Sequence, residues 1–288
     1  MHRHAADAGR WAAACVSGAC ECGEGASEPV IKEITCETAI GYEYPPDGGK
    51  VPVLDAYDGC QLSCPYCFQW QNQPWNQDLL VKTNLPDVLA RELDAWDTSH
   101  TRYVGSRSDP YMALEARYRL TRRILQVLYT RGVPCYLSTK SNAPAFFDDL
   151  RLFLDYREKL IIGLGQANLT HLRKTRDPRE LPNLRTANKL AQLGIPTQVF
   201  ITPVLPGITD VPAMISVLPE SMPVFLDKLR LEVGSVAEHR FFDYLKSYYP
   251  ELESRYRALV REGTDPYYQE LHERYRDEPR IQFVFGVP

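Results

Sequence analysis

The feature that most constrains this 288-residue sequence is a group of three cysteines in residues 55–70, DAYDGCQLSCPYCFQW. Cys60, Cys64 and Cys67 are separated by three and then by two residues. Thiolates hold iron–sulfur clusters in proteins, and each iron of a [4Fe-4S] cluster needs one ligand from outside the cluster. Three thiolates therefore leave one iron open.

An open iron can bind the amino and carboxylate groups of S-adenosylmethionine (SAM). One electron from the cluster then cleaves the sulfonium to a 5'-deoxyadenosyl radical, so the cofactor carries the chemistry while the protein orients it and excludes water. Two alternatives stay open, a structural zinc site and buried thiols. Structural zinc sites usually pair C-x2-C with a second such unit, and no second pair follows Cys67 within reach.

Composition and charge narrow the class of protein. Hydrophobic residues make up 44% and charged residues 24%, as in an ordinary globular protein. The formal net charge of −4 disfavours non-specific binding to a DNA backbone, which depends on lysine and arginine. No apolar run is long enough to span a bilayer, and residues 1–25 lack a signal-peptide core. We expect a cytoplasmic protein.

Strand and helix patterns alternate from residue 51 onward. The expected strands are 51–57, 102–109, 133–140, 159–165, 196–202 and 227–233, and the expected helices are 85–96, 115–129, 145–156, 184–193 and 211–218. Such alternation predicts an α/β fold with a parallel sheet and right-handed crossovers, curved into a partial (β/α)6 barrel. We expect this barrel at 51–236, after a partly disordered, cysteine-containing extension at 1–50 and before a helical tail at 237–288 that covers the barrel.

Side chains at the carboxyl ends of the expected strands are candidates for the site, because chemistry in such barrels occurs there. The two-residue alternation of strands places Lys140 inward and Cys135 toward the helices, and it puts Ser108 at a strand end. Arg230 and Glu232 share a face of the last expected strand. Charge inside a barrel is costly unless it is paired or occupied, so these two are candidate substrate ligands or an internal ion pair that braces the barrel.

Two further groups of residues are open to more than one interpretation. Cys15, Cys20, Cys22 and Cys36 could bind a second cluster or metal, although their spacing matches no known ligand pattern. Residues 151–189 carry nine lysines and arginines against four acids, a local charge of +5. This segment, centred on HLRKTRDPR at 171–179, is either a solvated helix face, as charge runs usually are, or the mouth of a site for an anionic substrate.

The three-cysteine spacing, with Tyr66 and Phe68 beside the last cysteine, resembles the signature of the radical SAM superfamily. Within it, the chain resembles the family of spore photoproduct lyase. The blocks that carry this resemblance fall in order, at 55–68, 81–84 (VKTN), 108–125, 138–141 (STKS) and 193–210. The resemblance implies a [4Fe-4S] cluster on the three cysteines and SAM as the second cofactor.

The resemblance also implies roles for single residues. The residues that it implies for SAM binding are Tyr66, Phe68, Ser108, Ser138, Lys140, Ile201 and Thr202. Among them, Lys140 would pair with the SAM carboxylate, and the backbone near Ile201 and Thr202 would receive the adenine. In the lyases, a cysteine two residues before the serine that matches Ser108 returns a hydrogen atom to the substrate radical. Here that catalytic position is Ser106, whose O–H bond is too strong for the same role, so thymine-dimer repair is disfavoured.

We therefore predict a radical SAM enzyme that abstracts hydrogen from a small molecule or peptide in a biosynthetic pathway. The net charge of −4 disfavours duplex DNA as its substrate. It would need an external electron donor such as flavodoxin or ferredoxin. The rival enzyme is a lyase that repairs or modifies nucleic acid. The rival from another class is a sensor that holds iron–sulfur or zinc.

Overall fold

The computed structural model describes residues 29–43, 49–71 and 75–285. The chain divides into two compact units. The first unit contains Met1–Ser63, Trp75–Ile162 and Leu193–Pro196, and the second contains Cys64–Pro74, Gly163–Gln192 and Thr197–Pro288. None of the described helices is both long and apolar enough to cross a membrane.

The first unit holds the amino-terminal strands and the first helices of the fold. Its elements are β1 (Val30–Ile34), β2 (Gly41–Glu43), β3 (Val51–Leu54), β4 (Tyr57–Asp58), β5 (Asp78–Lys82), α2 (Leu85–Glu92), β6 (Arg102–Val104), α3 (Glu115–Tyr118), α4 (Leu120–Thr130), β7 (Cys135–Thr139), α5 (Pro144–Asp148) and α6 (Leu150–Tyr156). The boundary between the units falls inside β8 (Leu160–Gly165).

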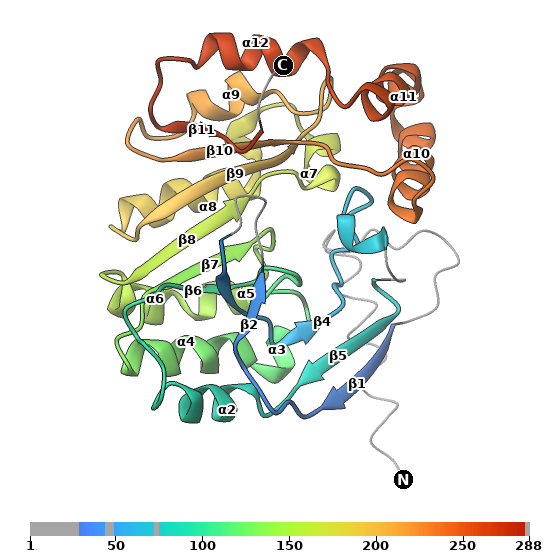
Figure 1. Cartoon of the computed structure of the whole chain (residues 1–288). Helices are drawn as coiled ribbons and strands as arrows, with labels where there is room; N and C mark the ends of the chain where they lie inside the picture. The colour runs from blue at the N-terminus through green and yellow to red at the C-terminus, as the bar shows by residue number, and fades with distance from the viewer. Residues whose placement is uncertain (1–28, 44–48, 72–74, 286–288) are drawn as a thin grey trace. The chain divides into compact units, whose positions relative to one another are not determined.

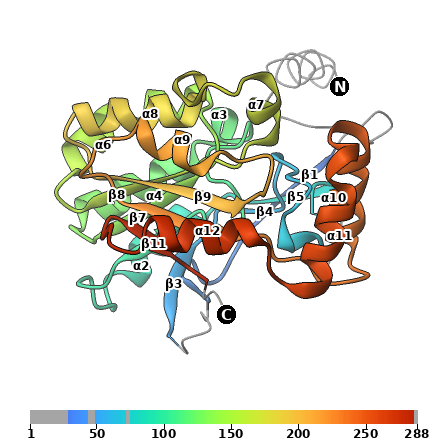
Figure 2. The same ribbon diagram turned by 90° about the horizontal axis from the view of Figure 1, so that it is seen from above.

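The second unit holds the later strands and the carboxyl-terminal helices. Its elements are the 3-10 helix η1 (Phe68–Gln71), α7 (Leu169–Lys174), η2 (Pro178–Glu180), α8 (Pro182–Gln192), β9 (Thr197–Val204), α9 (Val211–Ser216), β10 (Val224–Lys228), α10 (Val236–Tyr248), η3 (Pro250–Leu252), α11 (Glu253–Glu262), α12 (Pro266–Arg274) and β11 (Ile281–Phe283). Figure 2 shows α10 and α11 side by side, and the rings of Phe241 and Tyr256 meet between them at 5.2 Å.

The main sheet has eight strands in the order β11-β10-β9-β8-β7-β6-β3-β2 (Figure 1). Strands pair in parallel at β3–β6, β6–β7, β9–β10 and β10–β11, and antiparallel at β2–β3. The two edge strands are β2 and β11, so the described strands form an open sheet. The predicted α/β class with a parallel, incompletely closed sheet is confirmed.

Strands also form within the amino-terminal extension expected at residues 1–50. β1 pairs in parallel with β5, which pairs with β4 in a separate three-stranded sheet, and β2 pairs with β3 at the edge of the main sheet. Cys36 follows β1, and its backbone N–H and thiol both lie near Asn84 Oδ1, at 2.8 and 3.4 Å. Cys15, Cys20 and Cys22 lie outside the described residues.

In each unit, apolar residues of the helices and strands form the buried core. In the first unit α2 and α4 pack together, with Leu89 and Leu128 completely buried. In the second unit Val199 and Ile201 of β9 and Leu226 of β10 are completely buried. Along both strands buried residues largely alternate with half-buried ones, so that one face of each strand packs into the core.

Two expectations about the end of the chain are wrong. The strand expected at 227–233 is β10 at Val224–Lys228, because the apolar run that the sheet buries, Val224 and Leu226, precedes the charged residues. Arg230 and Glu232 therefore follow the strand and are exposed. The region after residue 237 is also not purely helical, since β11 returns to pair with β10.

Gly105, directly after β6, allows a close approach between β6 and β7 in the first unit. Its φ of +85° is a conformation that favours glycine, and a Cβ there would lie 2.3 Å from the Ser138 carbonyl oxygen of β7. Gly194 has a similar φ of +71°, but a Cβ there would meet nothing within 4 Å. Comparing substitutions at the two glycines therefore distinguishes the cost of a left-handed backbone from the cost of a steric clash.

We predict that Gly105→Ala lowers the free energy of unfolding by at least about 3 kcal/mol, because it adds a clash to the roughly 1–2 kcal/mol of left-handed strain. Gly194→Ala, the matched control, should cost only the strain. Urea denaturation of the two variants and the wild type gives both values. Equal losses at the two positions would contradict the close approach of β6 and β7.

Candidate functional site

The first part of the cysteine loop lies in the first unit and is held by backbone contacts. Gly59 has a φ of +89°, and a Cβ there would lie 2.6 Å from the Asp78 carbonyl oxygen. The next residue, Cys60, donates its backbone N–H to the Trp75 carbonyl at 2.9 Å. Only glycine fits at position 59, so the direction in which the chain presents Cys60 is fixed by β5 and the segment before it.

The second part of the loop lies in the second unit and forms a tight turn. Cys67 donates its backbone N–H to the Cys64 carbonyl at 3.1 Å, and Trp70 Nε1 donates to the same carbonyl at 3.1 Å. Trp70 is 2% exposed, and the guanidinium of Arg240 on α10 lies 3.7 Å from its ring centroid. Both cysteines are half-buried.

The donor set of this loop fits an iron–sulfur cluster by its chemistry. Cys60, Cys64 and Cys67 are thiols rather than disulfides, and soft thiolates are the ligands that such clusters take. Among the residues that the structure describes, no group of three or more His, Cys, Asp and Glu side chains is arranged to hold a single metal ion. Their thiol chemistry and their spacing within eight residues make these three cysteines the candidate cluster ligands.

Ser106 and Ser108 follow β6 rather than belonging to it. β6 ends at Val104, so the expected strand 102–109 is too long. Ser106 is exposed, whereas Ser108 is 3% exposed and donates its hydroxyl to the Tyr57 carbonyl at 2.9 Å. Ser108 thus ties the loop after β6 to the strand that leads into the cysteines, and its oxygen keeps lone pairs that can accept a hydrogen bond.

Lys140 follows directly after β7, and a buried carboxylate holds its backbone. Asp109 accepts hydrogen bonds from the Lys140 N–H at 2.7 Å and from Thr139 Oγ1 at 2.8 Å. Burial raises the pKa of Asp109, while these donors oppose the rise. Lys140 and Ser138 are half-buried, and Cys135 on the opposite face of β7 is 1% exposed. Burial alternates along β7 as expected, and the inward direction of Lys140 stays a prediction.

Sequence reasoning missed Asp55, the first residue after β3. Its Oδ1 accepts the Arg107 N–H at 3.1 Å, but its Oδ2 is buried without a hydrogen-bond partner. Burial raises the pKa of Asp55 to about 6, against the opposing effects of the Arg107 N–H and of the charge on Lys82. A polar residue at the carboxyl end of a strand was the only signal that could have singled it out.

In the second unit, Tyr66 and the predicted adenine segment are buried parts of the fold. The Tyr66 hydroxyl donates to the Ala167 carbonyl, which follows β8. Ile201 is completely buried on β9 and the adjacent Thr202 is half-buried. Tyr66 therefore fixes the cysteine turn to the main sheet, while Ile201 pairs with Leu226 of β10 just before the register of the two strands shifts.

A pocket of about 410 Å³ in the second unit brings together three of the predicted site residues, Phe68, Arg230 and Glu232. Phe68 directly follows Cys67 and is 56% exposed. Arg230 pairs with Asp227 at 2.8 Å, so it is a surface ion pair and not the internal brace considered from the sequence. Apolar side chains of α11, Leu259 and Val260, complete one wall.

Asp55 generates a prediction about pH. Because its pKa in the folded protein lies above its ordinary value, the folded state holds the proton more tightly, and the wild type loses stability as the pH rises from about 4 through 6. Asp55→Asn removes this dependence, so its stability relative to the wild type should rise by about 2–3 kcal/mol between pH 4 and pH 7.

Urea denaturation at several pH values measures this difference. Asp277→Asn is the matched control, since Asp277 is exposed and its substitution should leave the pH dependence unchanged. If the difference in the free energy of unfolding between Asp55→Asn and the wild type stayed constant from pH 4 to pH 7, the pKa of the Asp55 carboxyl would not be raised by folding.

Comparisons with known proteins agree with this geometry. Residues 55–215 match the family model described as "Radical SAM superfamily". MJ0683 of Methanocaldococcus jannaschii is 30% identical over 223 residues, which cover 70% of this chain and 79% of that protein. Rv2578c of Mycobacterium tuberculosis is 25% identical over 265 residues, covering 83% and 76%. Both carry the description "uncharacterized protein".

Solved structures of spore photoproduct lyase share the fold. The lyase complexed with dinucleoside spore photoproduct matches with a TM-score of 0.51 at 15% identity, over 73% of this chain and 66% of that chain. A double mutant with bound AdoMet and the same dinucleoside matches with a TM-score of 0.50 at 13% identity. The chain thus spans just under two thirds of the lyase. With the family model matched over more than half of its length, the chain belongs to the radical SAM superfamily.

Proposed function

We propose that Cys60, Cys64 and Cys67 ligate the cluster of this enzyme and that the pocket at Phe68, Arg230 and Glu232 binds a small-molecule or peptide substrate. The observation that carries the proposal is the position of Phe68. This ring follows the last cysteine in the chain and forms a wall of the pocket. A ligand in the pocket therefore contacts the residue next to a cluster ligand.

Membership of the superfamily makes the chain an enzyme that cleaves SAM, with a [4Fe-4S] cluster and SAM as its cofactors. When bound, these cofactors supply one-electron cleavage of SAM to a 5'-deoxyadenosyl radical that abstracts hydrogen from a substrate. An external reductant such as flavodoxin or ferredoxin would provide the electron.

The residues of the first unit are proposed to hold the methionine part of SAM. Lys140 would pair with its carboxylate, as a charge-assisted hydrogen bond, and Ser138 and Ser108 would offer hydroxyl groups. Asp109 supports this role, because it accepts the Lys140 N–H and so fixes the backbone of that residue. In the second unit, the backbone near Ile201 and Thr202 would receive the adenine, and Tyr66 would hold the cysteine turn.

Charge in the pocket favours a polar substrate with a cationic or hydroxyl group. Glu232 is exposed, and its carboxylate makes no hydrogen bond or ion pair with another described residue, whereas Arg230 is already paired with Asp227. Lys228 donates to the Gly263 carbonyl at 2.9 Å. Glu232 is therefore the uncommitted charge at this pocket, and it can accept hydrogen bonds from an amine or a hydroxyl.

The tail after residue 237 is proposed to limit the access of water to the cysteine turn. Its first helix, α10, places Arg240 over the Trp70 ring. A primary radical is quenched by a stray hydrogen donor, so a fixed cover over the turn favours reaction with the bound substrate.

Repair of nucleic acid remains the rival proposal. The solved lyase complexes carry a dinucleoside photoproduct, and the fold alone does not separate the two activities. Ser106, at the position of the lyase's hydrogen-donating cysteine, and the net charge of −4 support the small-molecule or peptide reading.

We predict that anaerobically reconstituted protein with SAM and dithionite forms 5'-deoxyadenosine, and that deuterium from a labelled small molecule or peptide enters it. Mass spectrometry of the product measures the label. With the substrate so identified, Glu232→Gln should lower label transfer at least tenfold while leaving substrate-independent SAM cleavage unchanged. Glu220→Gln, which changes an exposed glutamate of the same unit, should match the wild type.

Three outcomes would contradict the proposal. Label that comes only from damaged DNA would identify the rival lyase. Absence of deoxyadenosine from protein that holds iron and sulfide would indicate a sensor. Equal effects of Glu232→Gln and Glu220→Gln would place the substrate elsewhere.

A further inference from the structure

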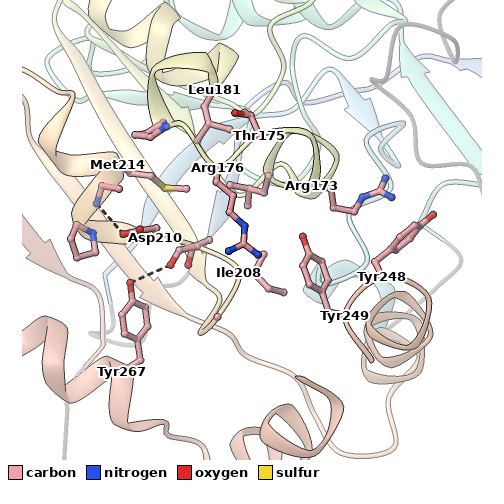
Figure 3. Close-up of a pocket in the computed structure, with 16 residues that line it drawn as sticks. Arg173, Thr175, Arg176, Leu181, Ile208, Asp210, Met214, Tyr248, Tyr249 and Tyr267 are labelled. Carbon is pink, nitrogen blue, oxygen red and sulfur yellow. Dashed lines mark hydrogen bonds between the residues drawn. The ribbon is translucent and has the colours of Figure 1, made fainter. Parts of the chain in front are cut away.

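Tyr267 and Asp210, two polar side chains that line a pocket of about 620 Å³ in the second unit, already have partners (Figure 3). The Tyr267 hydroxyl accepts the Val211 N–H at 3.1 Å and donates to the Thr209 carbonyl at 3.2 Å. Asp210 accepts the Ala213 N–H at 3.0 Å at the start of α9. These bonds hold the walls of the pocket together, so neither side chain requires a ligand.

A much smaller cavity in the first unit, of about 10 Å³, contains a polar atom in the opposite situation. The polar side chains in its lining are those of Asp55, Tyr57, Ser108 and Thr121. The Oδ2 atom of Asp55 is buried without a hydrogen-bond partner among the described residues. A buried acceptor without a partner is costly, and ordered water usually satisfies such an atom when no protein group does.

The other polar side chains of this lining offer acceptors rather than donors. The Tyr57 hydroxyl donates to Glu115, and the Ser108 hydroxyl donates to the Tyr57 carbonyl at 2.9 Å. The Thr121 hydroxyl donates to the Pro110 carbonyl at 2.7 Å. Each hydroxyl carries one hydrogen, so only its lone pairs remain for an occupant of the cavity. The occupant must therefore donate hydrogen bonds.

Size and charge identify this donor as water. The cavity is large enough for one water molecule and too small for an organic ligand. Positive charge already lies beside Asp55, because Lys82 Nζ donates to the Asp55 carbonyl oxygen at 3.0 Å. Burial raises the pKa of the Asp55 carboxyl, and the charges on Lys82 and Arg107 oppose the rise. A cation in the cavity would be repelled by these charges, whereas water would not.

The cavity borders the loop 105–108, which carries two residues of the proposed site, Ser106 and Ser108. Asp55 already holds this loop, since its Oδ1 accepts the Arg107 N–H at 3.1 Å. A water molecule on Oδ2 completes the hydrogen bonding of the same carboxyl group. The orientation of the loop therefore depends on both oxygens of Asp55.

We propose that one ordered water molecule occupies this cavity and donates a hydrogen bond to Asp55 Oδ2, and that Asp55 and this water position the loop 105–108 for SAM. The second statement rests on the proposed role of Ser108 in binding SAM. Asp55 is a positioning residue in this scheme, because it acts on SAM through the loop and not by contact.

A crystal structure of the reconstituted wild type, at a resolution that shows ordered water, tests the site directly. We expect electron density for one water molecule within hydrogen-bonding distance of Asp55 Oδ2. This density should be lost in Asp55→Leu, which replaces the carboxyl by an apolar group of similar size. Crystals soaked in rubidium chloride distinguish water from a monovalent cation by anomalous scattering. An empty cavity in the wild type, or a rubidium signal there, would overturn the proposal.

Equilibrium dialysis of SAM against the reconstituted protein tests the positioning role. Asp55→Leu should raise the Kd for SAM at least about fivefold, the effect of one lost hydrogen bond. Asp55→Asn keeps an acceptor for the Arg107 N–H and a polar group for the water, so its Kd should stay within about twofold of the wild type. Asp87→Leu, the matched control, changes an exposed carboxylate on α2 of the same unit and should match the wild type. Iron and sulfide contents verify that each variant holds its cluster.

Ser108→Ala separates this proposal from the proposed function. If Ser108→Ala weakens SAM binding and Asp55→Leu does not, the positioning role is wrong while the SAM role of Ser108 stands. The reverse result would support Asp55 and contradict the SAM role of Ser108. Equal weakening by Asp55→Leu and Asp55→Asn would show that only the charge matters and would overturn the role of the water. Should Asp55→Leu fail to fold, the wild-type crystal structure and Asp55→Asn still decide.

Discussion

The structure depends first on how the backbone of the cysteine loop is held. Three thiolates within eight residues can meet one cluster only if the chain turns sharply and keeps that shape. Gly59 has a positive φ that favours glycine, and a Cβ there would clash with the Asp78 carbonyl oxygen. Trp70 Nε1 donates to the Cys64 carbonyl and so stabilises the turn between Cys64 and Cys67. The cover of Trp70 by Arg240 then links the carboxyl-terminal helices to the candidate cluster ligands.

Buried carboxylates organise the carboxyl ends of the strands in the first unit. Asp109 accepts bonds from both Thr139 and Lys140, and Glu115 accepts the Tyr57 hydroxyl and the Thr121 N–H at the start of α4. A carboxylate buried without such donors would be costly. These two side chains therefore hold loops from different strands in fixed positions, so that Ser108 and Lys140 do not depend on loop flexibility.

The sequence predicted those features of the fold that depend on local hydrophobic periodicity. Apolar runs with helix spacing predicted the α/β class and the parallel sheet, and the faces of β7 followed from alternation because Cys135 is buried there. The shift of β10 was not predictable from alternation alone, since polar residues such as Arg230 alternate equally well in a loop. Asp55 was missed because its burial and its neighbours arise from tertiary contacts.

The proposed cluster has one iron that no protein thiolate binds. Mössbauer spectroscopy of protein reconstituted with iron-57 tests this feature most directly. With SAM added, the account predicts three alike irons and one distinct iron. Loss of this cluster is expected in Cys67→Ala but not in Cys135→Ala, because burial raises the pKa of the Cys135 thiol and removes it from metal binding. Four irons unaffected by SAM, or a cluster that survives Cys67→Ala, would contradict it.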